Sequence, residues 1–166
     1  MSPTVYSPPV ATYTALGTTT LSGTDTEVLF SSIPSGFRDL VLVADANAAQ
    51  SDLRLRINGS TGSDYNWVYA QGNGSSATSN STSNGTSLGY FYVTANQPFV
   101  SVLQFLDYSA TDKQKSLLIR NNKNTERVSM IAGRWASTSA ITSISLFTLP
   151  SGGYTSGTFS LYGIEA

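Results

Sequence analysis

Histidine and cysteine are both absent from the 166 residues of this chain. The chain therefore has no disulfide or thiolate chemistry, and it lacks the usual zinc ligands and the usual general base for a serine nucleophile. It also contains no Gly-X-Ser-X-Gly elbow and no phosphate-binding glycine loop. The ten acidic residues lie in no motif that would pair two carboxylates for glycoside hydrolysis. The sequence predicts a protein that is not an enzyme and uses no cofactor.

Charge is scarce as well. Charged residues make up 11% of the chain, with a net charge of −1, whereas average soluble chains carry roughly 25%. Serine and threonine account for 46 of the 166 residues, so hydroxyl groups rather than charges solvate the surface. This composition is typical of a protein fixed in an assembly or working outside a cell. Lys113, Lys115, Arg120 and Lys123 cluster only loosely, and the sequence predicts no nucleic-acid binding.

Long apolar runs are missing too: none approaches the roughly 18 residues that a membrane span needs, so no membrane partner is expected. The first 17 residues lack the basic start and apolar core of a signal peptide. Residues 1–12 instead hold three of the six prolines. They predict an extended N-terminal arm, with a disordered tail as the alternative, followed by a single domain over 13–166. Candidate partner contacts in the arm are Val5, Tyr6, Pro8, Pro9 and Val10.

Strand signals, by contrast, are abundant. In residues 52–58, Leu53, Leu55 and Ile57 face one way and the polar side chains face the other, as in a half-buried strand. No segment has an apolar period of 3.6 residues. The pattern predicts an all-β fold, a jelly-roll-like antiparallel β-sandwich of about 8–10 strands. The low-complexity residues 71–87 are expected to form a long surface loop. The expected strands are 14–21, 26–32, 39–47, 52–58, 87–93, 97–109, 115–121, 127–135, 140–149 and 157–166.

The segment after the strand at 52–58 allows several interpretations. Asn58–Asp64 is rich in oxygen atoms that suit calcium, but Asp64 is its only carboxylate. A structural turn is therefore favoured over a metal site. Tyr65, Trp67 and Tyr69 alternate and share one face, either as core aromatics, which we favour, or as a platform for a glycan. The four Asn-X-Ser/Thr glycosylation sequons, to which we give little weight, are at Asn58, Asn73, Asn80 and Asn84.

Five segments in order are similar to those of a known class of proteins. They are "SSIPSGFRDLVLVADA", "LRLRINGSTGSDYNW", "FLDYSATDKQKSLLIRNN", "GRWASTSAITSISLF" and the final "GTFSLYGIEA". Over about residues 24–166 the chain resembles small β-sandwich virion proteins of tailed bacteriophages, especially those that infect cyanobacteria and other aquatic hosts. Residues 1–15 lie outside the resemblance. It implies a structural protein of the virion and gives no catalytic residue to carry over.

The resemblance leaves two positions on the virion open. One is a capsid decoration or cement protein on the outer surface of the head, which binds the major capsid protein and copies of itself. We favour it because the arm and the charge-poor surface suit many weak contacts made together. The other is a tail or fibre module that binds a host glycan through Tyr65, Trp67 and Tyr69. By analogy with sandwich-type virion proteins, we expect a homotrimer.

Overall fold

The computed structural model describes residues 12–123, 127–149 and 152–165, without the side chains of residues 90–92 and 123. Within these ranges the chain forms strands, turns and bends and no helix, which confirms the all-β prediction. The strands are β1 (Tyr13–Leu21), β2 (Glu27–Phe30), β3 (Asp39–Ala48), β4 (Asp52–Ile57), β5 (Tyr65–Gly72), β6 (Ala77–Gly85), β7 (Leu88–Tyr92), β8 (Pro98–Leu106), β9 (Lys115–Lys123), β10 (Arg127–Trp135), β11 (Ile144–Thr148) and β12 (Tyr154–Ile164).

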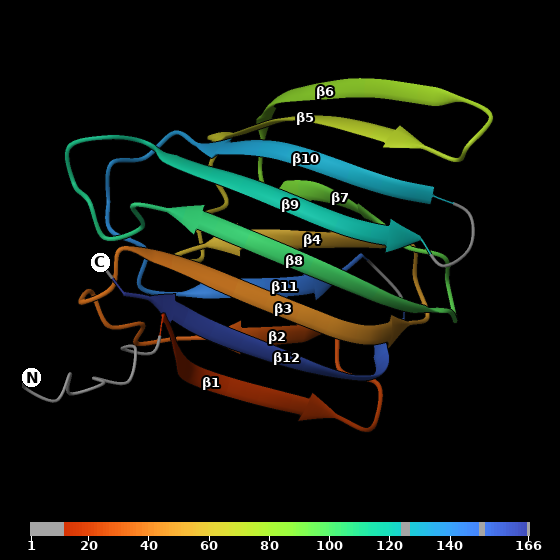
Figure 1. Cartoon of the computed structure of the whole chain (residues 1–166), viewed down its shortest axis with the longest axis horizontal. Helices are drawn as coiled ribbons and strands as arrows, with labels where there is room; N and C mark the ends of the chain where they lie inside the picture. The colour runs from red at the N-terminus through yellow and green to blue at the C-terminus, as the bar shows by residue number, and fades with distance from the viewer. Residues whose placement is uncertain (1–11, 124–126, 150–151, 166) are drawn as a thin grey trace, which may run out of the picture.

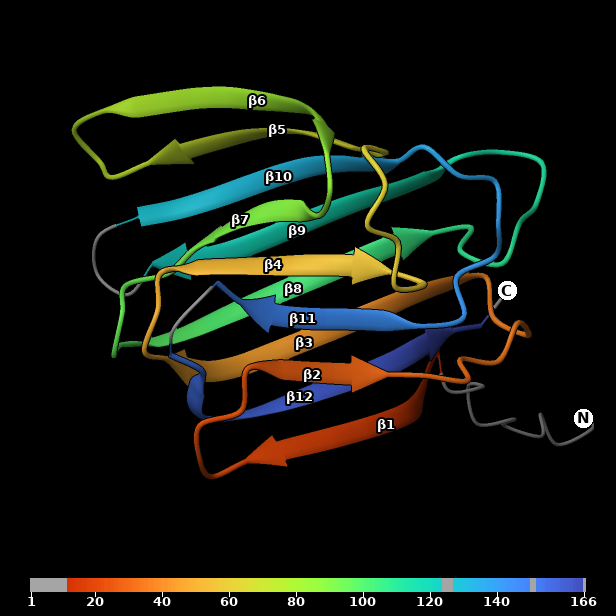
Figure 2. The same cartoon turned by 180° about the vertical axis from the view of Figure 1, so that it is seen from behind.

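The strands form two antiparallel sheets that pack face to face. The larger sheet has eight strands in the order β1-β12-β3-β8-β9-β10-β5-β6, and the smaller has four in the order β2-β11-β4-β7. The larger sheet is in front in Figure 1 and the smaller one in Figure 2. Side chains from both sheets join in one hydrophobic core. The architecture is a β-sandwich whose larger sheet extends beyond the smaller one at β5 and β6 (Figure 2).

The strand order of the two sheets shows how the chain passes through the sandwich. When β5–β6 and β9–β10 are set aside, the remaining strands form the rows β1-β12-β3-β8 and β2-β11-β4-β7. The chain crosses between the rows from β1 to β2, from β2 to β3, from β3 to β4, from β7 to β8, from β8 to β11 and from β11 to β12. The pairs β5–β6 and β9–β10 are hairpins added to the larger sheet beside β8. They widen one sheet and leave part of it without a covering layer.

Alternation of apolar side chains explains why these segments become strands of a sandwich. On β8, Phe99, Leu103 and Phe105 are buried, whereas their neighbours point outward. The β4 strand places Leu53, Leu55 and Ile57 in the core, as its sequence predicts. Burial of one such side chain stabilises the fold by roughly 1.5–3 kcal/mol.

The prediction of a long surface loop at residues 71–87 is wrong. Residues 77–85 form the strand β6, which pairs with β5 through a turn at residues 73–76. Asn73 Oδ1 accepts hydrogen bonds from the backbone N–H groups of Ser75 (3.1 Å) and Ser76 (2.8 Å), which fixes this turn. Most of β6 is solvent-exposed, so it has no apolar face that could have revealed the strand in the sequence.

The two ends of the domain lie next to each other. Tyr13 of β1 pairs with Ile164 of β12, and the carbonyl of Thr12 accepts a hydrogen bond from Glu165 N–H at 3.1 Å. The structure therefore anchors Thr12 to the end of β12. The predicted arm contacts, Val5, Tyr6, Pro8, Pro9 and Val10, lie outside the described residues.

Candidate functional site

The turn at Asn58–Asp64 is held by its own polar side chains. Asp64 Oδ2 accepts hydrogen bonds from Ser60 Oγ at 2.8 Å and from Trp135 Nε1 at 3.1 Å. Asn58 has a positive φ of 52°, and its Oδ1 accepts the N–H groups of Thr142 at 2.8 Å and Ser143 at 3.0 Å. These contacts tie the end of β4 to the segment before β11. The segment is therefore a turn held by hydrogen bonds, as the sequence predicts.

The aromatic row that follows belongs to the core. Tyr65 is fully buried and Trp67 nearly so, while Tyr69 is half-buried and packs against the same cluster. Tyr65 Oη accepts the N–H of Ile57 at 2.9 Å, and burial raises the pKa of Tyr65 to about 12. Two of the three rings therefore offer no face to a sugar. Of the two interpretations of this aromatic row, the structure therefore supports core packing.

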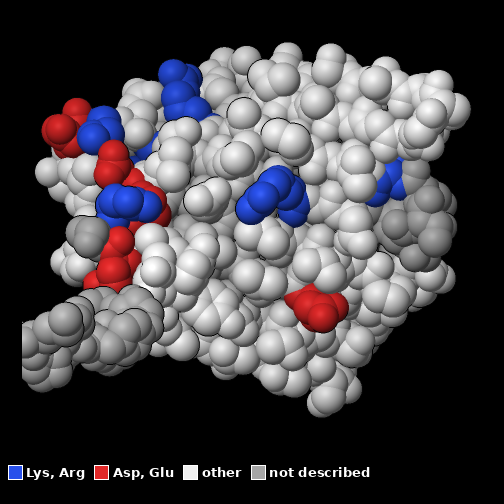
Figure 3. Space-filling view, in the orientation of Figure 1, with Lys and Arg blue, Asp and Glu red and all other residues white. Residues whose placement is uncertain are grey.

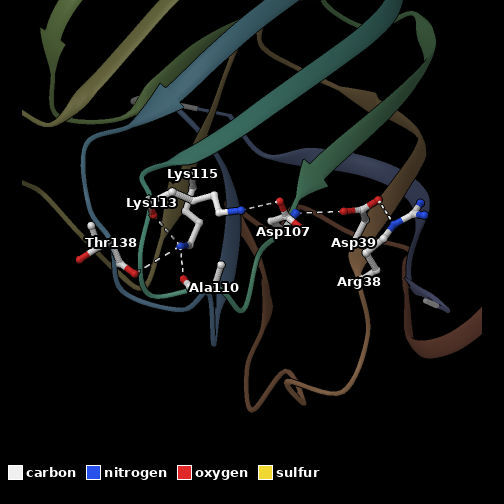
Figure 4. Close-up of polar contacts among 7 residues, drawn as sticks. All are labelled: Arg38, Asp39, Asp107, Ala110, Lys113, Lys115 and Thr138. Carbon is white, nitrogen blue, oxygen red and sulfur yellow. Dashed lines mark hydrogen bonds and ion pairs between the residues drawn. The ribbon is translucent and has the colours of Figure 1, made fainter.

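Charged groups gather where β8 ends and β9 begins. Arg38 Nε lies 2.9 Å from Asp39 Oδ2, and Asp39 Oδ1 accepts the backbone N–H of Asp107 at 2.9 Å. Lys113 Nζ in turn lies 3.0 Å from Asp107 Oδ2 (Figure 4), and this contact raises the pKa of Lys113. The chain of contacts joins the start of β3 to the β8–β9 loop. Its acids are paired with bases, so it serves as a clamp rather than as a catalytic pair.

Lys115 is buried at the same end. Its ammonium group donates to the carbonyl oxygens of Ala110, Lys113 (3.1 Å) and Thr138 (3.3 Å) (Figure 4). Burial lowers the pKa of Lys115. Three carbonyls around one ammonium cross-link two loops, which is a structural role. The loose basic cluster of the sequence is therefore dispersed: Lys115 is internal, Lys113 is paired and Arg120 lies on the outer face of the larger sheet.

The outer face of the larger sheet is the main surface feature of the molecule. Along β10, Ile131 and Trp135 point into the core, whereas Val128 and Met130 point outward and are 67% and 54% exposed. We call the exposed apolar side chains of this face the outer patch; they are Val68, Val100, Leu106, Val128 and Met130. In Figure 3, charged residues gather at one end of the face, and most of the remainder carries none. A broad sheet face with few charges and several exposed apolar side chains is typical of a protein interaction surface.

A groove crosses this face at the end of the sheet remote from the charged clamp. Its volume is about 820 Å³. The walls include Ala70 of β5, Thr78 of β6, Val100 of β8 and both Val128 and Met130 of β10. Arg120 is the one charged residue among the lining side chains, and Asn122 Oδ1 accepts the N–H of Val100 at 2.7 Å. The groove thus offers apolar contact with a few polar groups.

The outer face of the smaller sheet differs in charge. Arg54 forms a two-point ion pair with Asp52, at 2.6 and 2.7 Å. Arg56 lies over the ring of Phe147, with the guanidinium carbon 4.5 Å from the ring centroid. Leu29 is the exposed large apolar residue of β2 on this side. The outer face of the smaller sheet therefore carries an ion pair and a stacked arginine, whereas the outer face of the larger sheet carries mainly uncharged and apolar side chains. The two outer faces of the sandwich differ in polarity.

Among the described residues, no three potential metal ligands of the His, Cys, Asp or Glu type lie together. No helix in this part of the chain could cross a membrane. Comparison with protein-family models, with curated proteins and with solved structures finds no match to this chain. The chemistry of the surface and the resemblance of the five segments therefore carry the functional argument.

The outer patch was not singled out from the sequence, although a signal for it exists. In "RVSMIAGRW", apolar residues occur in both sets of alternating positions, which point to opposite faces of a strand. Val128 and Met130 belong to one set, and Ile131 and Trp135 belong to the other. A strand covered on one side only should show polar residues in one of these sets. Apolar residues in both sets indicate a strand that is covered on both sides or that exposes apolar groups to a partner.

Proposed function

We propose that this protein is a structural protein of a bacteriophage virion, and that it decorates the outer surface of the head by binding the major capsid protein. The observation that carries the proposal is the outer face of the larger sheet, which exposes Val68, Val128 and Met130 on a nearly uncharged surface. Exposed apolar side chains on such a face add no stability to a free monomer. A protein held in an assembly buries them.

Two further observations support a mechanical rather than a catalytic role. The acids of the charged clamp are engaged by Arg38 and Lys113, and the described residues contain no cluster of metal ligands. Asn58 Oδ1 and Asp64 Oδ2 accept hydrogen bonds that hold turns. Polar side chains that form ion pairs and hydrogen bonds within the sandwich stabilise its fold. A stable sandwich of this kind suits a protein that transmits mechanical load between neighbouring subunits.

We further propose that the protein acts as a homotrimer and that the N-terminal arm, residues 1–11, adds contacts to neighbouring subunits. Each arm would contribute a modest free energy, but several arms in one assembly act together through effective concentration. The glycan-binding alternative is not carried forward, since Tyr65 and Trp67 lie inside the sandwich.

The test uses heads that lack the protein. Purified chain is added to such heads, and bound protein is measured by sedimentation together with the temperature at which the heads release DNA. We expect saturable binding and a higher release temperature. The Val68→Glu chain should bind at least tenfold more weakly, whereas Leu29→Glu, at a position of similar exposure on the smaller sheet, should bind as the natural chain does. Heads that take up no protein at any concentration would reject the proposal.

A chain without residues 1–11 separates the contribution of the arm. Because Thr12 bonds to Glu165, this deletion keeps the first anchor of the domain. We expect its melting temperature to be close to that of the full chain and its attachment to heads to be weaker. Full attachment by the shortened chain would show that the arm has no part in binding.

A further inference from the structure

The groove on the outer face calls for an occupant of particular chemistry. Its walls are small or apolar, from Ala70, Val100, Val128 and Met130, and Arg120 supplies the one charge. A volume of about 820 Å³ is within the range of about 300–1,000 Å³ that holds a compact ligand, and it is large enough for a short peptide segment. The occupant should be uncharged, apolar in part and extended.

Residues 1–11 have this composition. The segment "MSPTVYSPPVA" contains no charged side chain, three prolines and the apolar residues Val5, Tyr6 and Val10. Prolines lack N–H donors, so a proline-rich segment presents mainly carbonyl acceptors to a partner. Arg120 and the amide of Asn122 in the groove are donors. Because prolines already restrict the free segment, it loses less entropy on binding.

The geometry keeps Tyr6 and Val10 of the arm away from the groove of their own chain. The groove at Met130 is in register with Thr18 of β1 but lies five strands away, which is about 24 Å at the usual spacing. The arm leaves at Tyr13, a further five residues along β1 from Thr18. The aligned row runs through Thr18, Ser160, Val43, Val102, Arg120 and Met130.

An extended chain covers about 3.3 Å per residue. Val10 is three residues from Tyr13 and reaches about 10 Å, and Tyr6 reaches about 23 Å. Both distances are shorter than the separation from Tyr13 to Met130, which combines about 24 Å across the strands with roughly 15 Å along them. Tyr6 and Val10 of an arm can therefore lie at Met130 only if the groove belongs to another copy.

We propose that the groove formed by β5, β6, β8, β9 and β10 binds residues 1–11 of a neighbouring copy of this chain, so that subunits exchange arms. The inference deepens the proposed function by naming one partner of the outer face, and it rests on the part of that proposal that makes this face a protein-binding surface. It does not depend on the identity of the shell.

Because the chain lacks cysteine, a single Ser7→Cys substitution gives a unique site for a spin label in the arm. Spin-labelled chains with natural nitrogen are mixed with full-length ¹⁵N-labelled chains that carry no spin label. Any broadening of ¹⁵N amide signals then comes from the arm of another copy. We expect broadening at Ala70, Val128 and Met130 and none at Leu29. Absence of broadening, or broadening confined to Leu29 or to the free edge of β6, overturns the proposal.

A pair of matched variants tests the groove itself. Met130→Glu in the ¹⁵N-labelled chain should abolish the broadening, and Leu29→Glu should leave it intact; the two side chains are 54% and 57% exposed. Should Met130→Glu alter the fold, which the same spectra reveal, Val128→Lys at a 67% exposed position replaces it. Equal effects of the groove and control variants would refute the assignment. Arm exchange in chains that fail to bind heads would reject the proposed function alone.

Discussion

Trp135 donates its indole N–H to Asp64 Oδ2 at 3.1 Å, although 71 positions separate the two residues in the chain. The same strand ends are joined by the backbone, since Ala136 N–H donates to the carbonyl of Asp64 at 2.8 Å. Trp135 closes β10 and Asp64 precedes β5, and these strands pair with Trp135 opposite Tyr65. One carboxylate thus fixes where the added hairpin β5–β6 begins.

We expect Asp64→Ala to lower the free energy of unfolding by about 1–3 kcal/mol, because the buried indole N–H of Trp135 loses its acceptor. Thermal denaturation monitored by tryptophan fluorescence measures the loss. Asp45→Ala, at an exposed position of β3, should leave the stability unchanged. An Asp64→Ala chain as stable as the natural one would mean that this hydrogen bond contributes nothing.

Asp64 also decides the prediction about metals. With one carboxylate in the turn, and its Oδ2 engaged by Ser60 and Trp135, we expect no divalent ion to be needed for folding. The melting temperature should be the same with calcium and with an excess of chelator. A strong fall in chelator would contradict this, and loss of that fall in Asp64→Asn would place the ion at the turn.

Gly133 of β10 provides the space that Leu88 of β7 occupies. A Cβ at position 133 would overlap Leu88 Cδ1, so Gly133→Ala should cost roughly 1–3 kcal/mol through overpacking. Leu88→Ala alone should cost about 2–5 kcal/mol through the cavity it leaves. In the double variant, the new methyl group fills part of that cavity, and denaturant unfolding should show a loss smaller than the sum of the two. Strict additivity would show that the two positions do not share space.

Buried tyrosines make the fold sensitive to alkali. Burial raises the pKa of Tyr65 to about 12 and raises the pKa of Tyr154 as well, from an ordinary value of 10.0. Above pH 10 the unfolded chain loses these protons while the native chain keeps them, so stability is full below pH 10 and falls as pH rises above it. Each such tyrosine contributes a slope of about 1.4 kcal/mol per pH unit.

Tyr154→Phe should therefore reduce the alkaline slope by about one proton while changing stability at pH 7 little. Tyr65→Phe should reduce the slope similarly but also destabilise the protein by about 1–3 kcal/mol at pH 7, since Ile57 N–H loses its acceptor. Denaturant titrations between pH 7 and 11 measure both effects. Slopes that match that of the natural chain would show that neither phenol stays protonated in the native state.

The sequence predicts much of the sandwich and less of its edge. Strands such as β4 and β8 alternate apolar and polar residues because one face is buried, and this pattern is readable without a structure. The strand β6 has no such pattern, because neither of its faces is covered and its serine, threonine and asparagine residues resemble a loop. What makes β6 a strand is pairing with β5, from Gly72 opposite Ala77 to Tyr65 opposite Gly85, and pairing of this kind is not visible in local composition.

The features of the candidate site also differ in how far the sequence predicts them. The turn at Asn58–Asp64 and the inward row of Tyr65 and Trp67 could be anticipated from residue types and spacing. The outer patch could be anticipated only in part: the apolar residues on both faces of β10 are visible in the sequence, but the patch is assembled from β5, β8 and β10, which meet only through the sheet order. Val128 is exposed because it points to the outer face of the larger sheet, which no second layer covers within the described residues, and no local segment of the sequence records whether such a layer exists.

The pairing of β1 with β12 has a mechanical consequence. The proposed arm would lead into β1, whose eight paired positions run from Tyr13 to Leu21. A pull along the strand would load all of these pairs in shear at once, whereas a pull away from the sheet edge would peel them apart one by one. The direction of a force that a neighbour applies to the arm would therefore decide how the β1–β12 pairing responds. A force along the strand would meet high resistance, whereas a force away from the sheet edge would open the pairs one at a time at a small load.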